Sequence, residues 1–386
     1  MTQENSPLLF DDPTALCLEI SEADQERAWR ECANVTHPVS HWRAFRNRLT
    51  LAVLLPWIRE DIDPHAAVWP APTALSAFWD LVGGTALTAN GKRWVICLDE
   101  TDGTAPVHIP QEWLDIPAWA ADYYLLVHLD LAGQLLRVSG WATHRQIKTL
   151  GRFDPRDRTY CVEESLIQTG LGSLWAITAG GLLLAEPTRA AMPEVPGLTV
   201  SQARALIERL GNPKISEPRL EVPFEQWAAL ISHDGWCQGL YAHRRGLPPQ
   251  WSVLEWLKNG VSELAREAGW SAAATVGAEA RSAGSNLVFF SRVLSIADKT
   301  CELCIEQITP GVWRFRLRTT LWNSRLPAGT TLRLLTENLQ SFENNEVHAR
   351  TAVEEIAIDL TLEEGEGIVW EIETAPKHFQ REILQF

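Results

Sequence analysis

The sequence lacks every motif that would assign a chemistry with high specificity. No catalytic, metal-binding or nucleotide-binding signature occurs in its 386 residues. No repeat is found at the periods that solenoid proteins use. Function must therefore be sought in the architecture and in residue clusters, and we expect neither a cofactor nor a metal ion.

Positive charge is also scarce in this chain. The 34 Lys and Arg residues face 49 Asp and Glu residues, which leaves a formal net charge of −15. An anionic surface repels phosphate backbones, because nucleic-acid binding depends on Lys and Arg that replace counterions. The composition therefore argues against general nucleic-acid binding and favours a basic protein partner.

Cysteine is sparse, and seven is an odd number for a disulfide framework. The N-terminal stretch lacks the basic and apolar regions of a secretory signal peptide. Reduced thiols in the cytoplasm are therefore expected. The uncharged run Ser165–Ala185 is long enough to cross a bilayer, but its four glycines favour a buried helix. We accordingly expect no membrane contact and leave the oligomeric state open.

Hydrophobic periodicity predicts an α+β protein whose first part, residues 1–190, mixes helices with antiparallel strands. Helical spacing extends over residues 21–34 and 39–60, where Pro56 should kink or end the second helix. Two hairpins follow, the first of them turning at Asn90-Gly91, a pair typical of tight turns. The helices can cover one face of the resulting sheet.

The remainder of the chain predicts two further parts. Residues 191–283 form a mainly helical middle segment, with helices expected over 224–244 and 251–268. Residues 284–386 hold seven candidate strands separated by turn residues. That spacing is typical of a β-sandwich-like domain.

Tryptophan is unusually frequent, with 18 residues against four tyrosines. Its indole packs in cores and at interfaces, where the N–H finds a partner. Helical spacing predicts core positions for four of them, namely Trp29, Trp42, Trp57 and Trp79. Trp251 and Trp256 of the middle helices could instead form a patch that docks a partner.

Three blocks of sequence resemble one known family. They are IPQEWLDIPAWAADYYLLVHLDLAGQLLRVSGWATHRQIKTLGRFDPRDR (Ile109–Arg158), WLKNGVSELAREAGW (Trp256–Trp270) and LPAGTTLRLLTE (Leu326–Glu337). These blocks are similar to the cyanobacterial domain-of-unknown-function family 1822 (DUF1822). The resemblance implies no activity, and the genomic setting of such genes, near sigma-factor and signalling genes, implies a regulatory or scaffolding role.

A cysteine and a histidine could form a hydrolytic site. Cys161 could act as a nucleophile if His144 or His233 served as its base, because thiolate chemistry needs an adjacent imidazole. A half-buried structural cysteine is the more common state of this residue. Catalysis by Cys161 and His144 therefore stays the alternative hypothesis.

The segment after His144 concentrates ionisable residues in a short turn. Such a cluster beside a rigid sheet is where a binding site is sought. An internal ion-pair network that anchors the loop is the favoured interpretation, but the cluster is still the best candidate site in the chain. Its candidate binding residues are Arg152, Asp154, Arg156, Asp157 and Arg158.

One strand of the C-terminal part alternates arginines with apolar residues. Period two places Arg314, Arg316 and Arg318 on one face, which could be a solvated surface or a groove for an acidic peptide. Taken together, the sequence favours a non-enzymatic, cytoplasmic regulatory or protein-interaction protein.

Overall fold

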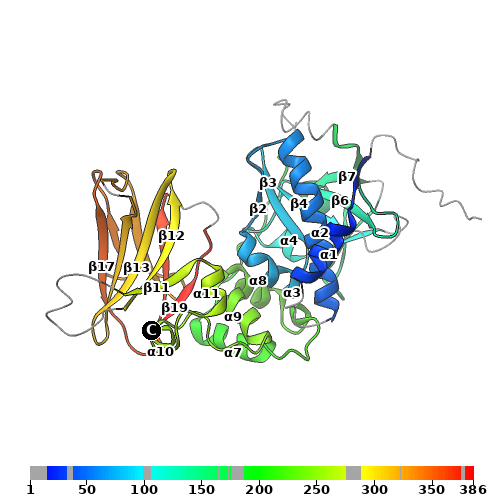
Figure 1. Cartoon of the computed structure of the whole chain (residues 1–386). Coiled ribbons are helices and arrows are strands. Elements are labelled where there is room, and N and C mark those ends of the chain that lie inside the picture. The colour runs from blue at the N-terminus through cyan, green and yellow to red at the C-terminus, as the bar shows by residue number, and fades with distance from the viewer. Residues whose placement is uncertain are drawn as a thin grey trace, which may run out of the picture. The chain divides into compact units, whose positions relative to one another are not determined.

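The computed structural model describes residues 15–32, 38–98, 106–163, 166–172, 174, 187–274, 288–321, 323–374 and 379–386. Helices and strands are both abundant, which confirms the α+β class (Figure 1). The chain divides into two compact units. The N-terminal unit comprises Met1–Pro196 and Pro213–Ser232, and the C-terminal unit comprises Gly197–Asn212 and His233–Phe386.

The helical segment expected between two domains is instead shared by the two units. Helix α8 (Phe224–Ser232) belongs to the N-terminal unit, whereas α7 (Val200–Leu210) and α9 (Asp234–Arg244) belong to the C-terminal unit. The single helix expected over 224–244 breaks at His233, whose extended backbone and side chain form the N-cap of α9.

The helix expected over 251–268 is also interrupted. Gly260 adopts a φ of 82°, which ends α10 (Val253–Asn259) before α11 (Glu263–Glu267) begins. Glycine reaches this left-handed region without the steric penalty of a side chain. The breaks at His233 and Gly260 have the same physical cause. Apolar residues continue at helical spacing across each break, so periodicity alone predicts one helix where the backbone forms two.

A seven-stranded sheet forms the centre of the N-terminal unit. Its path runs β1-β7-β6-β4-β3-β2, with β10 paired to β7, and only β4 and β6 are parallel. The strands are β1 (Leu16–Glu19), β2 (Ala67–Trp69), β3 (Thr85–Ala89), β4 (Lys92–Leu98), β6 (Tyr123–Asp130), β7 (Leu135–Thr143) and β10 (Gln168–Thr169).

Both hairpins predicted in this part are confirmed. Asn90 and Gly91 have φ values of 49° and 68° and join β3 to β4. Positive φ at both central residues is what a two-residue hairpin turn requires. The second hairpin pairs β6 with β7 across a turn that contains Gln134, with φ 54°.

Three helices cover one face of this sheet. They are α1 (Glu22–Glu31), α2 (Pro38–Asp61) and α3 (Leu75–Leu81), the last preceded by the 3-10 turn η1 (Pro72–Ala74). Figure 1 shows α2 lying over the strands, and Leu49 and Ile58 of this helix share a core with Leu125 and Trp141 of the sheet. Pro56 does not end α2, which continues to Asp61.

The tryptophans of these helices do not all lie in the core. Trp79 is buried, but Trp29 and Trp42 keep 50% and 47% of their surface exposed. Both rings pack beside Phe45, with ring centroids 5.3 Å apart in each pair. The predicted core positions of Trp29 and Trp42 are therefore wrong. Each indole packs against Phe45 with part of its ring and leaves the rest exposed to solvent.

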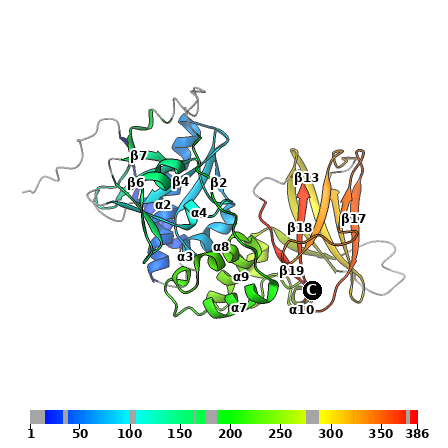
Figure 2. The same ribbon diagram turned by 180° about the vertical axis from the view of Figure 1, so that it is seen from behind.

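Short elements cover the other side of the sheet, as the view from behind shows (Figure 2). Helix α4 (Glu112–Asp115) is tied to the sheet by Tyr124, whose hydroxyl donates to the carbonyl of Trp113 at 2.6 Å. Around it lie α5 (His144–Leu150), η3 (Pro218–Leu220) and a small sheet of β5 (Val107–Pro110), β9 (Thr159–Val162) and β8 (Arg152–Asp154).

The C-terminal unit contains two antiparallel sheets. The five-stranded sheet consists of β11 (Trp270–Ala274), β12 (Val288–Ile296), β13 (Lys299–Thr309), β14 (Val312–Thr319) and β17 (Glu355–Thr361). The four-stranded sheet consists of β16 (Glu346–His348), β15 (Thr331–Thr336), β18 (Gly367–Glu373) and β19 (Ile383–Gln385). Phe315 of the first sheet and Trp370 of the second share one core with Trp256 of α10. The sandwich-like prediction is thus supported in part, since helices also contribute to this core.

Across the part of the chain that the structure describes, no helix combines the length and the apolar character that a bilayer crossing needs. Most of the uncharged run Ser165–Ala185, for which a buried helix is predicted, lies outside the described residues.

Candidate functional site

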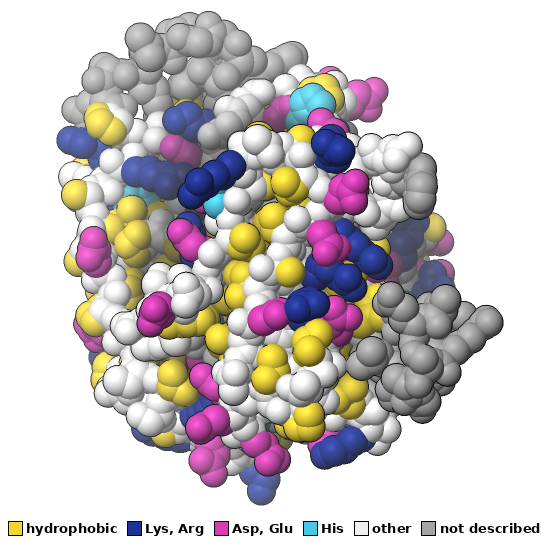
Figure 3. All heavy atoms as spheres, turned by 90° about the vertical axis from the view of Figure 1, so that its left-hand side faces the viewer, with side chains coloured by type: hydrophobic (Ala, Val, Ile, Leu, Met, Phe, Trp, Pro, Cys, Tyr) yellow, Lys and Arg dark blue, Asp and Glu magenta, His cyan; other side chains and the backbone are white. Residues whose placement is uncertain are grey.

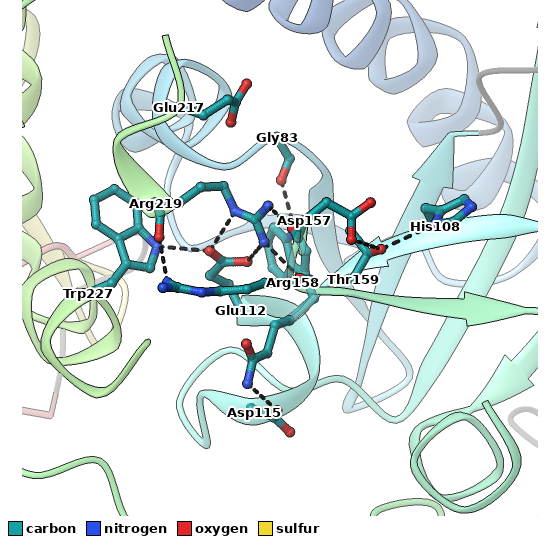
Figure 4. Close-up of polar contacts among 12 residues, drawn as sticks. Gly83, His108, Glu112, Asp115, Asp157, Arg158, Thr159, Glu217, Arg219 and Trp227 are labelled. Atoms are coloured by element: carbon teal, nitrogen blue, oxygen red, sulfur yellow. Dashed lines mark hydrogen bonds and ion pairs between the residues drawn. The ribbon is translucent and has the colours of Figure 1, made fainter. Parts of the chain in front are cut away.

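The ionisable turn predicted as a site packs against helix α4. Glu112 of α4 is completely buried, and its carboxylate accepts three hydrogen bonds (Figure 4). Arg219 donates through Nε and Nη2 at 2.8 Å each, and the indole Nε1 of Trp227 donates at 2.8 Å. A bidentate guanidinium pair of this kind compensates a buried carboxylate well. We name Glu112, Asp115, Arg158, Arg219 and Trp227 the α4 cluster.

Each arginine of this cluster donates hydrogen bonds to backbone carbonyls in the segment that carries the other arginine. Arg158 donates to the carbonyls of Arg219 and Val222 at 2.5 Å each, and Arg219 donates to those of Asp157 and Arg158 at 2.6 and 2.9 Å. Arg158 does so from a left-handed backbone with φ 53°. These hydrogen bonds join the predicted turn to the η3 segment, and we call the reciprocal pair of arginines the clasp.

The other members of the predicted turn have local partners. Asp157 accepts from the hydroxyl of Thr159 at 2.8 Å, and Asp154 accepts from the backbone amide of Arg156 at 2.9 Å. The Arg152 guanidinium lies 4.0 Å from the sulfur of Cys161. These contacts organise a turn through the side chains of Arg152, Asp154 and Asp157 and the backbone amide of Arg156.

Helix α4 also carries Asp115, which forms a second polar group with Lys148 and Tyr160. Lys148 lies 2.5 Å from Asp115, and Lys148 also contacts the Tyr160 hydroxyl, which donates to Asp115 at 3.0 Å. Burial raises the pKa of Tyr160. Burial opposes the charge of Lys148, but its bonds to Asp115 and Tyr160 outweigh that effect and raise its pKa. At neutral pH the Lys148 ammonium and the Asp115 carboxylate therefore form an ion pair, and the protonated Tyr160 hydroxyl bonds to both.

Neither ring nitrogen of His144 is directed at Cys161. The His144 Nε2 hydrogen-bonds the carbonyl of Leu114 at 2.8 Å, and Nδ1 accepts from the amide of Ala190 at 3.0 Å. Burial lowers the pKa of His144, which favours the neutral imidazole that this pattern requires. The structure therefore holds His144 as a backbone link, with both nitrogens engaged, while Cys161 is buried in β9.

The arginine stripe of β14 is neutralised within its own sheet. Arg314 makes two bonds of 2.7 Å to Asp359, and Arg318 lies 2.9 Å from Glu302. Arg316 lies between Glu306 and Glu355, at 3.6 and 3.8 Å. Figure 3, which faces the left-hand side of Figure 1, shows basic and acidic side chains interspersed on that face. An acidic peptide would have to displace these carboxylates.

The two tryptophans predicted to bind a partner differ in burial. Trp256 is buried, and its Nε1 donates to the carbonyl of Gln250 at 3.0 Å. Trp251 is only partly buried and lines a pocket of about 460 Å³ in the C-terminal unit. That volume falls within the range of about 300 to 1,000 Å³ typical of small-ligand sites.

This pocket, which we call the Trp251 pocket, has apolar walls. They come from α7, from α9 with the loop that follows it, and from β19, and the wall residues include Ile207, Leu247, Pro248, Pro249, Trp251 and Ile383. The proline pair restricts the loop backbone, so the pocket wall is largely preformed.

A buried carboxylate is among the groups that line the Trp251 pocket. The side chain of Glu337, which follows β15, is only 7% exposed. It accepts from Nε1 of Trp236 at 3.2 Å and from Nη2 of Arg204 at 2.7 Å. A Cβ added to Gly367 would come within 2.7 Å of the Glu337 carboxylate, so a glycine keeps the space that this side chain needs.

Sequence reasoning singled out Trp251 but missed Glu337 and Arg204. These two residues lie 133 positions apart. Glu337 ends the LPAGTTLRLLTE block, but nothing in that block indicates an arginine partner for it. The nearest signal in the sequence is the Pro248-Pro249 pair beside Trp251, which indicates a restricted loop but no ligand.

A second, smaller pocket of about 160 Å³ lies in the N-terminal unit. Arg43, Gly84, His108 and Trp113 are among its lining residues, and Arg43 is already paired with Glu217 at 2.7 Å. The volume is below the usual size of a ligand site. The Trp251 pocket is therefore the stronger candidate. No group of three or more His, Cys, Asp and Glu side chains within the described residues could hold a metal ion.

The comparisons with known proteins identify a family but no activity. A family model described as "Protein of unknown function (DUF1822)" matches residues 18–385, nearly the whole chain. No curated protein and no solved structure matches the chain.

Proposed function

Since this chain belongs to the DUF1822 family of proteins of unknown function, we propose that it acts by protein interaction rather than catalysis, as a regulatory or scaffolding protein of the cytoplasm. The Trp251 pocket is the proposed contact site for a protein partner. The observation that carries this proposal is an apolar pocket of about 460 Å³ walled by a partly exposed tryptophan and two exposed prolines.

The composition of the pocket supports binding to a protein. Tryptophan is enriched among the residues that contribute most to interface affinity, because its large rigid ring fills a partner's cavity at low entropic cost. Trp251 presents part of its ring at the surface, and Pro248 and Pro249 beside it are exposed. The half-exposed indoles of Trp29 and Trp42 add a second apolar feature in the N-terminal unit.

The groups that could support the alternative, a hydrolase, are engaged elsewhere. His144 has both nitrogens bonded to the backbone, and Lys148, Tyr160 and Asp115 saturate one another. A general base needs a free lone pair within reach of the proton that it removes. These contacts favour the interaction hypothesis.

The proposal is tested by capture with matched variants. The immobilised full-length chain is incubated with lysate of its own host as wild type, Trp251→Ala and Val293→Thr. Val293 is an exposed apolar residue of β12, 57% exposed, and serves as the control. A partner that binds through the pocket is recovered by the wild type and by the control but lost by Trp251→Ala.

The captured protein is then purified and titrated against all three chains. Truncation of a central interface tryptophan is expected to weaken binding about tenfold or more. Equal affinity for all three chains would show that the pocket is not the contact site, and turnover of a substrate by the isolated chain would contradict the non-enzymatic role.

A further inference from the structure

The Trp251 pocket contains an internal ion pair whose two members differ greatly in exposure. The Glu337 side chain is 7% exposed, whereas that of Arg204 is 51% exposed. A buried carboxylate needs a positive partner, since leaving it unpaired carries a large desolvation penalty. Arg204 therefore supplies the positive charge that the buried Glu337 carboxylate needs. Its own side chain is half exposed, so few packing contacts hold it in place.

From this asymmetry we propose that the Trp251 pocket recognises an arginine side chain in a basic segment of the partner protein. The incoming guanidinium takes the place of Arg204 on Glu337. This inference rests on the proposed interaction function and names the chemistry of the partner.

The geometry at Glu337 suits a guanidinium. Trp236 fixes one carboxylate oxygen through its indole N–H, at 3.2 Å, so the carboxylate is held in one orientation. The other oxygen already accepts from the Nη2 of an arginine at 2.7 Å. The Arg204 side chain therefore marks the position that a partner's planar donor fork would occupy.

The walls suit the rest of an arginine side chain. The Trp251 ring lines the pocket, and a guanidinium or its methylene stem packs favourably on such a ring. Pro248, Pro249 and Leu247 supply further apolar surface for the stem. A purely polar occupant would leave the apolar walls without contacts, and an acidic occupant that displaced Arg204 would meet the like charge of Glu337.

The charge of the whole chain favours the same partner. A formal net charge of −15 attracts basic segments and repels acidic ones.

A second acceptor lies close to the Glu337 carboxylate. Arg204 donates to the carbonyl of Gly365 at 3.2 Å, and a guanidinium that replaced Arg204 could use the same carbonyl.

The test uses a fluorescein-labelled peptide, Gly-Gly-Arg-Gly-Gly, and a matched peptide in which citrulline replaces the arginine. Citrulline keeps the shape and removes the charge. Fluorescence anisotropy with the full-length chain should show about tenfold tighter binding of the arginine peptide, the size expected for a charge-assisted hydrogen bond.

Two variants of the ion pair separate the roles. Arg204→Gln removes the internal competitor, while the glutamine amide can still donate to Glu337, so it should bind the arginine peptide several-fold tighter than the wild type does. Glu337→Gln should bind the two peptides equally. Thermal unfolding of both variants establishes that they are folded.

The inference is overturned if neither the wild type nor Arg204→Gln prefers the arginine peptide. In that case the capture experiment still decides the proposed function, because loss of a partner by Trp251→Ala does not depend on the partner's arginine. A partner that depends on Trp251 but binds Glu337→Gln normally would support the interaction role and contradict the arginine site.

Discussion

Arg158 and Arg219 each donate hydrogen bonds to backbone carbonyls of the other's segment, although 61 positions separate them in the chain. Two like charges lie close together here because Glu112, fully buried, accepts two bonds from Arg219. The clasp joins the turn before β9 to η3, and through Trp227 it also reaches α8. The cluster that looked like a binding site in the sequence thus holds distant parts of the N-terminal unit together.

Removing Arg219 should destabilise the N-terminal unit strongly. Arg219→Met leaves the Glu112 carboxylate buried without its cation, and breaking a buried pair in this way typically costs about 3 to 5 kcal/mol. Urea unfolding measures the change in free energy. As the control, Arg314→Met breaks an exposed pair with Asp359 and should cost about 1 kcal/mol or less. Similar losses for both variants would contradict the structural role given to the α4 cluster.

Gly84 should tolerate alanine much less well than Gly91. Both glycines have positive φ, 85° and 68°, so alanine adds backbone strain at either site. At Gly84 the new Cβ would also lie 2.5 Å from the indole nitrogen of Trp113, whereas nothing lies within 4 Å at Gly91.

We expect Gly91→Ala to cost about 1 kcal/mol and Gly84→Ala about 1 to 3 kcal/mol more, from the overpacking that the clash produces. Thermal unfolding of the two variants measures the difference. Equal melting temperatures would show that the Trp113 ring moves aside without loss of packing.

Acidification should weaken the C-terminal unit through His233. Burial lowers the pKa of this histidine to about 4 in the folded chain, whereas the unfolded value is about 6.5. Between these values the unfolded chain binds the extra proton, so stability is full above about pH 6.5 and falls as the pH drops toward 4. The contribution lost by about pH 5 is roughly 2 kcal/mol.

The measurement compares the wild type with His233→Asn by urea unfolding at neutral and acidic pH. Asparagine keeps an N-cap for α9 but does not titrate. The wild type should lose more stability than the variant on acidification. Parallel losses would show that His233 carries its proton equally well in the folded and unfolded chain.

One thiol should react rapidly in the native protein. Cys17 is the exposed cysteine, and the other six, including Cys161, are buried. Burial raises the pKa of Cys304 to about 12 and also raises that of Cys237, so these thiols hold little reactive thiolate. Titration with an aromatic disulfide reagent should modify one cysteine in the native chain and seven in denaturant.

Cys17→Ser provides the control, because it should remove the fast phase and leave the slow one. A second fast thiol that disappears in Cys161→Ser would instead indicate an accessible, activated cysteine, and it would revive the hydrolase hypothesis.

Local patterns were enough to predict much of the fold. The Asn90-Gly91 pair specifies its hairpin turn, and alternation of period two located most strands of the C-terminal unit, since one face of each is buried. The same alternation placed Arg314, Arg316 and Arg318 on one face, where the structure has them. Each of these signals lies within one or two adjacent elements, so no knowledge of the packing was needed.

Only the tertiary structure decided what those side chains contact. The pairs Glu112 with Arg219 and Arg204 with Glu337 join residues 107 and 133 positions apart. The helix break at His233 likewise depends on a backbone conformation that apolar spacing does not encode. Periodicity reports which face of an element is buried, whereas an ion pair between distant elements depends on how those elements pack, and a single sequence carries no local signal for that.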